Sequence, residues 1–558
     1  RVLGPSQLAT RSELLHAATL PPLIGREDEL DLLVRAWQQA KSGRGRLTVV
    51  TGEAGIGKSR LLAALEERVA GDAHVSLRYF CAPLFQDSAL HPVIARWEQE
   101  AGFARGDSAA TRLRKLEAIL APSGLPPADT ALIAAMLSVP AGAGYPPPDA
   151  NPQRQRERTV AVLERRLIGM TRRQPVLMLL EDAHWADPST LDLIESGLRQ
   201  LATSRALLVV SARPEFTASW IGRPEVTVLT LSRLNRRQAS ALAAQAAGER
   251  PLAPALLHGV VAQADGVPLF IEELTEAVLE DSAAGAAEGH AAIAVPATLQ
   301  ASLMARLDRV PTGRHVAQVG AAIGRDFSHE LLRAVAEQPA ATVDQGLAEL
   351  VRAGLVLARG APPDARYSFK HALVQDAAYA SLLRGERRRL HARIVAVLER
   401  GDADGADDAP ELLARHCAEA GLDAKAAAAW LRAGTAALHR AAIAEALAHL
   451  AHGLTAAAAM EEGEARRRLE LDLWIARIKA LMSAEGHASR HLHEAFRHAQ
   501  DLCEQLGAAS QLVTVLYGQW SHAFVRGDFA EALRQAHGLL ALADTRGDTV
   551  CRLIGLLA

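Results

Sequence analysis

The sequence lacks the long hydrophobic runs of a membrane protein and the paired cysteines of a disulfide-rich protein. No apolar run approaches the roughly 20 residues that span a bilayer, and no signal peptide is visible. The four cysteines, Cys81, Cys417, Cys503 and Cys551, are scattered without paired spacing. This pattern predicts neither disulfides nor a zinc site, and it indicates a cytoplasmic protein without membrane segments.

An excess of one charge is also missing, because the net charge is only −3 over 558 residues. The chain therefore has no global attraction to nucleic acid or anionic lipid. Its 49% hydrophobic and 22% charged residues are typical of globular proteins, and its length predicts roughly three to five domains. An initiating Met is absent and a helical pattern runs to Ala558, so we expect a fragment of a longer polypeptide. The excess of Arg over Lys and the abundance of Ala point to a GC-rich bacterial genome.

The most specific motif is the glycine-rich loop Gly52-Glu53-Ala54-Gly55-Ile56-Gly57-Lys58-Ser59. It follows the apolar run 47–50 and precedes a helical pattern that starts at Arg60, which is the strand–loop–helix order of a P-loop. Its glycines let successive backbone N–H groups face one concavity that holds a polyphosphate. We predict that Gly52 to Arg60 bind ATP or ADP. Within this segment, Lys58 would neutralise the β- and γ-phosphates, and Ser59 would bind Mg²⁺.

Two acids, Glu181 and Asp182, follow the apolar run 175–180. A P-loop needs one carboxylate near Mg²⁺ and a second that orients the attacking water. We assign Glu181 to the metal and Asp182 to the γ-phosphate, with the reverse order as an alternative. Both acids are thus candidate metal-binding and catalytic residues, and an acidic pair without such a role is the less favoured interpretation.

Three side chains after the acid pair are further candidates. Arg213 follows the apolar run 206–211, and an Arg beside the P-loop strand can reach the γ-phosphate and distinguish ATP from ADP. The alternative for Arg213 is a surface position. His184 either touches the nucleotide site or packs locally, whereas Asp187 is expected to cap a helix that starts at Pro188.

The order of the apolar runs predicts the fold. Runs at 47–50, 75–81, 175–180, 206–211 and 226–231 predict strands separated by helices. The fold class is therefore an α/β P-loop NTPase with a doubly wound parallel sheet, followed by an all-α lid, a winged helix and an α-helical repeat superhelix. The expected segments are a linker (1–22), the NTPase core (23–232), the lid (233–296), a winged-helix-like domain (297–399), a linker (400–409) and truncated tetratricopeptide-like repeats (410–558).

Two C-terminal segments share small residues at positions where helices would cross. One contains Trp430 and Gly434, and the other contains Tyr517 and Gly527. We interpret them as helix-pair repeats of about 34 residues, with Ala-rich amphipathic helices as the alternative. The basic run 384–393 predicts a solvated helix face more strongly than a DNA contact.

Five motifs occur in a telling order: Leu23-Ile24-Gly25-Arg26-Glu27, the P-loop, the segment 180–187, Ser211-Ala212-Arg213-Pro214, and Gly266-Val267-Pro268. Over residues 23–395 this combination resembles the signal-transduction NTPases with numerous domains (STAND), in their bacterial origin-recognition-like AAA ATPase branch. The resemblance implies that Gly25 and Arg26 lie near the adenine, that Arg213 is the sensor, and that Pro268 is the lid contact.

Two shorter stretches add to this resemblance. The segment 369–374 is similar to the Met-His-Asp motif of related plant and animal members, whose His touches the ADP β-phosphate. His371 matches that His, but Ala372 stands where the motif has Asp, which puts the strength of an ADP lock in question. Residues 1–12 resemble the tail that follows a class III adenylate/guanylate cyclase domain. Such modules also precede LuxR-type DNA-binding domains.

Together these features predict an ATP-binding, slowly hydrolysing switch. It would couple a ligand or protein sensed by the repeats to an output domain upstream in the same polypeptide, preferentially a cyclase. The second hypothesis is a transcriptional regulator or DNA-acting AAA ATPase that uses the winged helix, although nucleic acid is a disfavoured partner. The third is a repeat scaffold with an inactive ATPase. Oligomerisation in the ATP state stays open.

Overall fold

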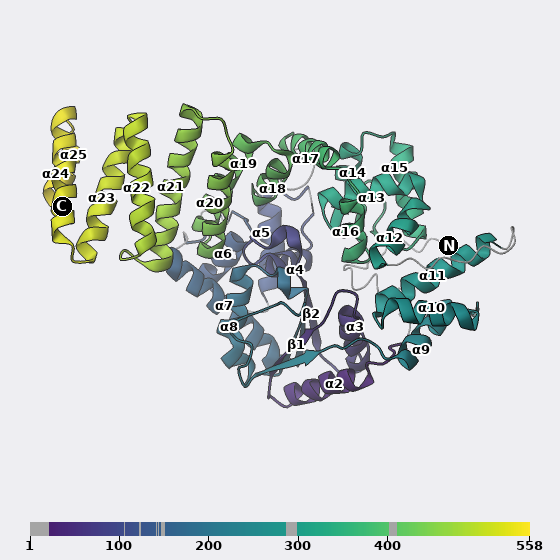
Figure 1. Cartoon of the computed structure of the whole chain (residues 1–558). Coiled ribbons are helices and arrows are strands. Elements are labelled where there is room, and N and C mark those ends of the chain that lie inside the picture. The colour runs from purple at the N-terminus through teal and green to yellow at the C-terminus, as the bar shows by residue number, and fades with distance from the viewer. Residues whose placement is uncertain are drawn as a thin grey trace.

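A computed structural model of the protein describes residues 22–104, 106–121, 124–140, 142, 144–146, 151–250, 252–285, 298–400 and 410–558. The predicted linkers 1–22 and 400–409, including the segment 1–12, lie outside the described residues except for Pro22 and Arg400. Figure 1 shows a sheet domain low in the view, helices to its right, and a row of helices that runs above the sheet toward the C-terminus.

A five-stranded parallel sheet forms the centre of the first domain. Its strands are β1 (Arg46–Thr51), β2 (Val75–Phe80), β3 (Val176–Glu181), β4 (Ala206–Ala212) and β5 (Val226–Thr230), in the order β2-β3-β4-β1-β5. Every residue of β3 and β4 is buried, because helices cover both faces of the sheet. This burial explains the continuous apolar runs, and the predicted α/β fold class is confirmed.

Helices pack on both faces of this sheet. One face is covered by α2 (Glu27–Lys41) and α3 (Lys58–Val69). The opposite face is covered by α4 (His91–Ala101), α7 (Pro152–Arg173) and α8 (Pro188–Leu201). The remaining elements of this domain are α5 (Ala109–Leu120), α6 (Pro127–Met136) and the short 3-10 turns η1 (Pro83–Phe85) and η3 (Ala183–Trp185).

A small all-helical module follows the sheet. Its helices are α9 (Arg236–Ala247), α10 (Pro254–Ala264) and α11 (Pro268–Gly285). Asn235 starts α9 through a reciprocal capping box with Gln238. Buried Leu242, Val260 and Leu274 join the three helices in one core. The module lies within the residues for which we expected the lid.

The next part combines helices with a small antiparallel sheet of order β6-β8-β7. Its elements are α12 (Leu299–Asp308), α13 (Pro311–Ile323), β6 (Asp326–Ser328), α14 (His329–Val335), α15 (Ala340–Arg352), β7 (Val356–Arg359), β8 (Arg366–Phe369), α16 (Ala372–Ala380) and α17 (Arg384–Glu399). The succession from α13 to β8 is that of a winged helix. The three-residue strand β6 was not predicted from the sequence.

The basic run lies on α17, and its residues Arg387 and Arg393 contact other parts of the protein. The guanidinium group of Arg387 lies 4.7 Å from the ring centre of Tyr379 and donates to the carbonyl of Leu382. Arg393 forms an ion pair with Glu337. These contacts favour the structural interpretation of the run over a DNA contact.

The C-terminal part is a series of packed helices. They are α18 (Pro410–Ala420), α19 (Asp423–His439), α20 (Ile443–Ala458), α21 (Glu464–Glu485), α22 (Arg490–Leu506), α23 (Ala509–Val525), α24 (Phe529–Arg546) and α25 (Thr549–Leu557). A Cβ at Gly434 would lie 2.7 Å from Leu450, and one at Gly453 would lie 2.5 Å from Leu473, so neighbouring helices approach at these glycines. None of the helices in the described ranges is long and apolar enough to cross a membrane.

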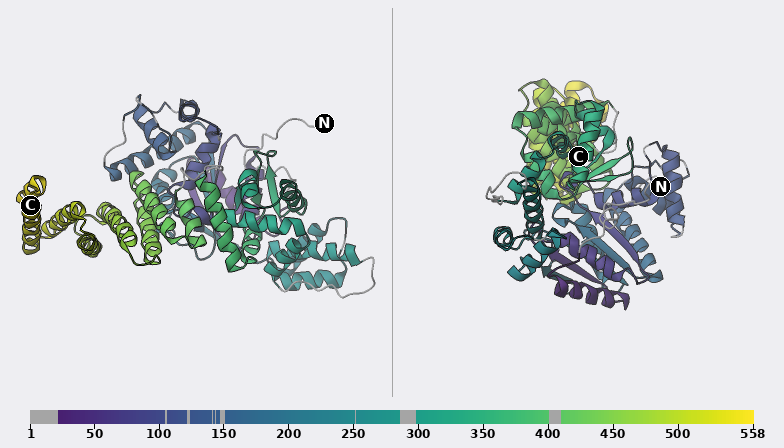
Figure 2. Two further views of the ribbon diagram at one scale, coloured as in Figure 1. Left: turned by 90° about the horizontal axis from the view of Figure 1, so that it is seen from above. Right: turned by 90° about the vertical axis from the view of Figure 1, so that its right-hand side faces the viewer.

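The first of these helices dock onto the sheet domain. The backbone N–H of Ser189, at the start of α8, donates to Glu445 on α20 (2.8 Å), and the Ser88 hydroxyl donates to Glu411 on α18 (2.8 Å). Both carboxylates are buried. The later helices extend beyond the sheet domain, as Figures 1 and 2 show. The repeats are therefore anchored by α18 and α20.

Candidate nucleotide-binding site

The P-loop lies at the carboxyl end of β1 and leads directly into α3. Gly55 and Gly57 adopt left-handed backbone conformations, with φ of +79° and +99°, which explains why glycine occupies these positions. Gly52 and Ile56 are buried, whereas Ser59 is exposed in the first turn of α3. The loop thus has the backbone shape that the motif predicts.

Lys58 lies inside this loop and is only 8% exposed. Its ammonium group donates to the carbonyl oxygens of Gly52 (2.7 Å) and Glu53 (2.9 Å). Burial lowers the pKa of Lys58, and the negative charge of Asp182 acts in the opposite direction. The lysine is therefore held at the loop, within reach of the negative charge of Asp182 after β3.

The start of α11 packs directly on the P-loop. The backbone N–H of Leu269 donates to the carbonyl of Gly55 (3.2 Å), and a Cβ at Gly55 would lie 3.1 Å from the Cβ of Leu269. Pro268 lies nearby, with its Cγ 3.9 Å from the place of a Cβ on Gly57. The helical module therefore contacts the loop through the Gly-Val-Pro motif that the sequence singled out.

The two acids after β3 have different partners. Glu181 forms a buried ion pair with Arg78 on β2 (2.6 Å), and Arg78 also binds Glu66. Asp182 instead forms an ion pair with Arg325 of the winged helix, with 3.0 Å between its Oδ2 and the Arg Nη1. The negative charge of Asp182 acts on Lys58. Which of the two acids would hold the metal stays a prediction.

His184 and Arg213 both lie near Lys58, because Arg213 acts electrostatically on Lys58 and Lys58 acts on His184. The guanidinium group of Arg213 is 5.1 Å from the ring centre of Trp185. Both ring nitrogens of His184 are buried and have no hydrogen-bond partner among the described residues. Burial lowers the pKa of His184 to about 4, and the charges of Lys58, Asp182 and Arg213 all act on it. The structure therefore brings a neutral imidazole into the group around the P-loop.

The winged helix contributes charged groups that sequence reasoning missed. Arg325, between α13 and β6, binds Asp182 as described. Asp376 on α16 is exposed, yet desolvation raises its pKa, and the nearby cations Arg213 and Arg325 act against this shift. The only available signal was the position of Asp376 five residues after His371, on the helix that follows the Met-His-Asp-like motif.

His371 itself is half-buried and directly precedes α16. Its neighbour Lys370 acts electrostatically on Glu272 of α11, as does Arg60 of α3. The segment that carries His371 therefore lies near the junction of lid and P-loop helix. Its contact with a nucleotide stays a prediction.

Gly25 and Arg26 directly precede α2, and Arg26 contacts the P-loop. Arg26 is 4% exposed and donates to the carbonyls of Ile56 in the P-loop (3.3 Å) and Ser232 after β5. A Cβ at Gly25, whose φ is +68°, would lie 2.6 Å from Gln238 of α9. Arg26 thus supports the loop through its backbone, and an adenine contact stays a prediction.

Asp187 caps α8, as the sequence predicts. Its carboxylate accepts from the backbone N–H and the hydroxyl of Thr190 and from the backbone N–H of Leu90. Burial raises its pKa to about 7, and the negative charge of Glu445 acts in the same direction. The cap at Asp187 therefore lies near Glu445 on α20, the repeat helix that docks at the start of α8.

Residues 22–210, which contain the P-loop and the acid pair, match the family described as AAA ATPase domain. These residues form an AAA ATPase domain. A curated relative, an uncharacterized protein of Rhizobium meliloti (strain 1021), is 28% identical over 508 residues, or 89% of this chain and 49% of the relative. The chain thus spans about half the length of the curated relative that it matches.

Solved structures with similar folds come from several organisms. A STAND protein with a tetratricopeptide repeat sensor from Pyrococcus horikoshii has a TM-score of 0.40 at 12% identity, and the match covers 96% of this chain and 80% of that one. The Aeropyrum pernix Orc1 protein in complex with DNA has a TM-score of 0.31 at 17% identity, with 66% and 96% covered.

The residues of the AAA ATPase domain fit a magnesium nucleotide. Left-handed glycines and the start of α3 form an anion cradle, and the buried His184 nitrogens have no partner among the described residues. Mg²⁺ takes few protein ligands and otherwise binds phosphates and water. Ser59, Glu181 and Asp182 are the side chains that would hold it.

Proposed function

We propose that the chain is an ATP-binding, slowly ATP-hydrolysing switch of the STAND type. One observation carries this proposal: three parts of the chain meet at the P-loop. The sheet domain supplies Lys58, the lid places Leu269 on Gly55, and the winged helix pairs Arg325 with Asp182. A nucleotide held there would contact all three parts and could change how they sit together, as a switch requires.

The contacts suggest a division of roles within the site. Asp182 is the acid that would hold Mg²⁺ or orient water, because its negative charge acts on Lys58. Glu181 would position the site through its buried pair with Arg78. Arg213 would act as the γ-phosphate sensor and His371 as a contact of the resting state. The ion pair with Arg325 neutralises Asp182, which suits a resting state in which ATP is hydrolysed slowly.

The repeats would receive the signal, and a domain upstream would deliver the output. The docking of α18 and α20 on the sheet domain supports this role, since a ligand or protein bound to the repeats could act on α8 directly. For the output we propose an adenylate or guanylate cyclase, on the resemblance of residues 1–12. For the DNA-acting alternative, Arg387 and Arg393 of α17 are engaged within the protein, and Arg384, Arg388 and Arg389 are the exposed arginines of the run.

Titration calorimetry with magnesium ATP and ADP tests the proposal. Lys58→Ala should weaken nucleotide binding on the order of 100-fold, because it removes a charge-assisted phosphate contact. Lys41→Ala is the control, since Lys41 pairs with Asp72 away from the loop. Unchanged ATP affinity in Lys58→Ala would refute the nucleotide site. ATP turnover in Asp182→Asn and Glu181→Gln then separates a switch from an inactive scaffold.

A further inference from the structure

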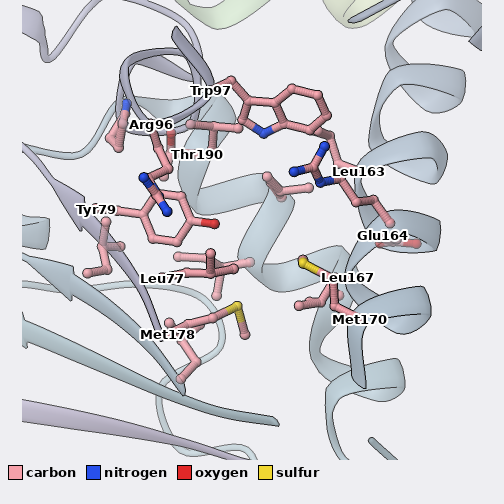
Figure 3. Close-up of a pocket in the computed structure, with 18 of the residues that line it drawn as sticks. Leu77, Tyr79, Arg96, Trp97, Leu163, Glu164, Leu167, Met170, Met178 and Thr190 are labelled. Carbon is pink, nitrogen blue, oxygen red and sulfur yellow. The ribbon is translucent and has the colours of Figure 1, made fainter. Parts of the chain in front are cut away.

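The AAA ATPase domain contains a cavity on the sheet face that α4, α7 and α8 cover. Its volume is about 150 Å³, and its walls are mostly apolar. Leu77 and Met178 contribute from the strands, and Leu163, Leu167 and Met170 contribute from α7. Figure 3 shows these side chains around a common space. Two flexible methionines let such walls adapt to the shape of a ligand.

Charged groups lie on one side of this space, around Tyr79 and Trp97. The guanidinium group of Arg166 lies 4.1 Å from the ring centre of Trp97 and pairs with Glu100. Arg96 lies beside Tyr79 in Figure 3. Burial raises the pKa of Tyr79 to about 12, so its hydroxyl stays neutral, and both arginines act on it electrostatically.

The hydrogen bonds leave cationic donors unpaired. Arg96 Nε and Arg166 Nη1 are buried and have no hydrogen-bond partner among the described residues. The acids of the cavity are already engaged, because Glu100 binds Arg166 and Glu164 accepts from Ser196 and Gln200. A buried guanidinium N–H without a partner is costly, and both arginines line the cavity, where an anionic group would pair with their charge.

We propose that this cavity binds a small amphipathic carboxylic acid. The apolar chain or ring would occupy the space between the strands and α7, where burial of each CH₂ is favourable. The carboxylate would accept from Arg96 and Arg166 near Trp97. The proposal is independent of the nucleotide switch, because the cavity lining in the described residues comes from β2, β3, β4, α4, α7 and α8 and not from the P-loop.

The chain offers a variant that fills this cavity. Gly197 of α8 lines it, and a Cβ there would have no atom within 4 Å. Gly197→Leu therefore adds a side chain at the cavity wall, and its Cβ meets no atom within 4 Å. Gly169 of α7 is equally open but does not line the cavity, so Gly169→Leu is the matched control. Both replacements raise helix propensity to the same extent, so a difference between the two variants reports on the cavity.

Titration calorimetry of the 558-residue chain with octanoate and with 1-octanol tests the proposal. Octanoate should bind at least about tenfold more tightly than octanol, because only the acid satisfies the arginines. Gly197→Leu should weaken octanoate binding by about tenfold or more, and Gly169→Leu should leave it unchanged. Arg96→Gln should bring octanoate and octanol to similar affinities. Thermal unfolding of each variant verifies that it is folded.

Two results would overturn the proposal. If Gly197→Leu bound octanoate as well as the parent chain, the acid would not occupy this cavity. If octanol bound the parent chain as tightly as octanoate, the arginines would not be recognising an anion. Loss of ATP binding in Lys58→Ala, by contrast, has no bearing on either result.

Discussion

The ion pair between Arg325 and Asp182 leads to a prediction about nucleotide release. The two side chains are 11% and 20% exposed and lie 3.0 Å apart, so water screens the pair only partly. Arg325→Gln removes the charge and leaves Asp182 without this partner. A charge-assisted contact of this kind contributes about 1–3 kcal/mol, which corresponds to roughly 5- to 150-fold in an equilibrium between docked and undocked winged helix.

Stopped-flow release of a fluorescent ADP analogue measures this effect. We expect Arg325→Gln to release the analogue at least about fivefold faster, since the winged helix then holds the closed arrangement less firmly. Arg314→Gln is the control, because Arg314 pairs with Asp308 at the surface, where both side chains are more than 40% exposed. Its release rate should match that of the parent chain.

A double-mutant cycle gives the refuting result. In an Asp182→Asn background, Arg325→Gln should cause little further change, because the charge it pairs with is already gone. If Arg325→Gln accelerated release equally in both backgrounds, the effect would not come from this ion pair. If release were unchanged in folded Arg325→Gln, the winged helix would not restrain the nucleotide through Asp182.

Two further predictions concern stability. Since burial raises the folded-state pKa of Asp187 from 3.8 to about 7, the unfolding free energy should fall as pH rises between these values. Asp187→Asn should flatten that fall in melting temperatures measured from pH 5 to 8, and an unchanged slope would contradict it. Gly266→Ala should lower the melting temperature more than Gly102→Ala, because a Cβ at Gly266 meets the carbonyl of Leu234 at 2.3 Å and one at Gly102 meets nothing. Equal decreases in melting temperature would mean that only the positive φ of the two glycines matters, which would contradict this reasoning.

The sequence predicts features of the fold that are set locally. The P-loop is a contiguous pattern whose glycines are required by positive φ, and β3 and β4 appear as apolar runs because both of their faces are covered. The cap at Asp187 is likewise a short-range signal, completed by Thr190 three residues later. Such features need no knowledge of distant residues.

The contacts that decide the site are long-range, and no pattern marks them. Arg78 and Glu181 are 103 positions apart, and Arg325 and Asp182 are 143 apart. An arginine at either place has the appearance of an ordinary surface charge. No feature of the sequence therefore indicates that Glu181 pairs with Arg78. The strand β6 was missed for a related reason, because three residues carry too little periodicity and its pairing with β8 is distant in sequence.

The two carboxylates that anchor the repeats are only half satisfied. Glu411 and Glu445 each have one buried oxygen without a hydrogen-bond partner among the described residues. Each such oxygen costs about 1–3 kcal/mol of desolvation, which offsets much of what the bonds to Ser88 and Ser189 contribute. Separation of α18 and α20 from the sheet domain would expose both oxygens to water. These two hydrogen bonds therefore contribute little net free energy to the docking of α18 and α20 on the sheet domain.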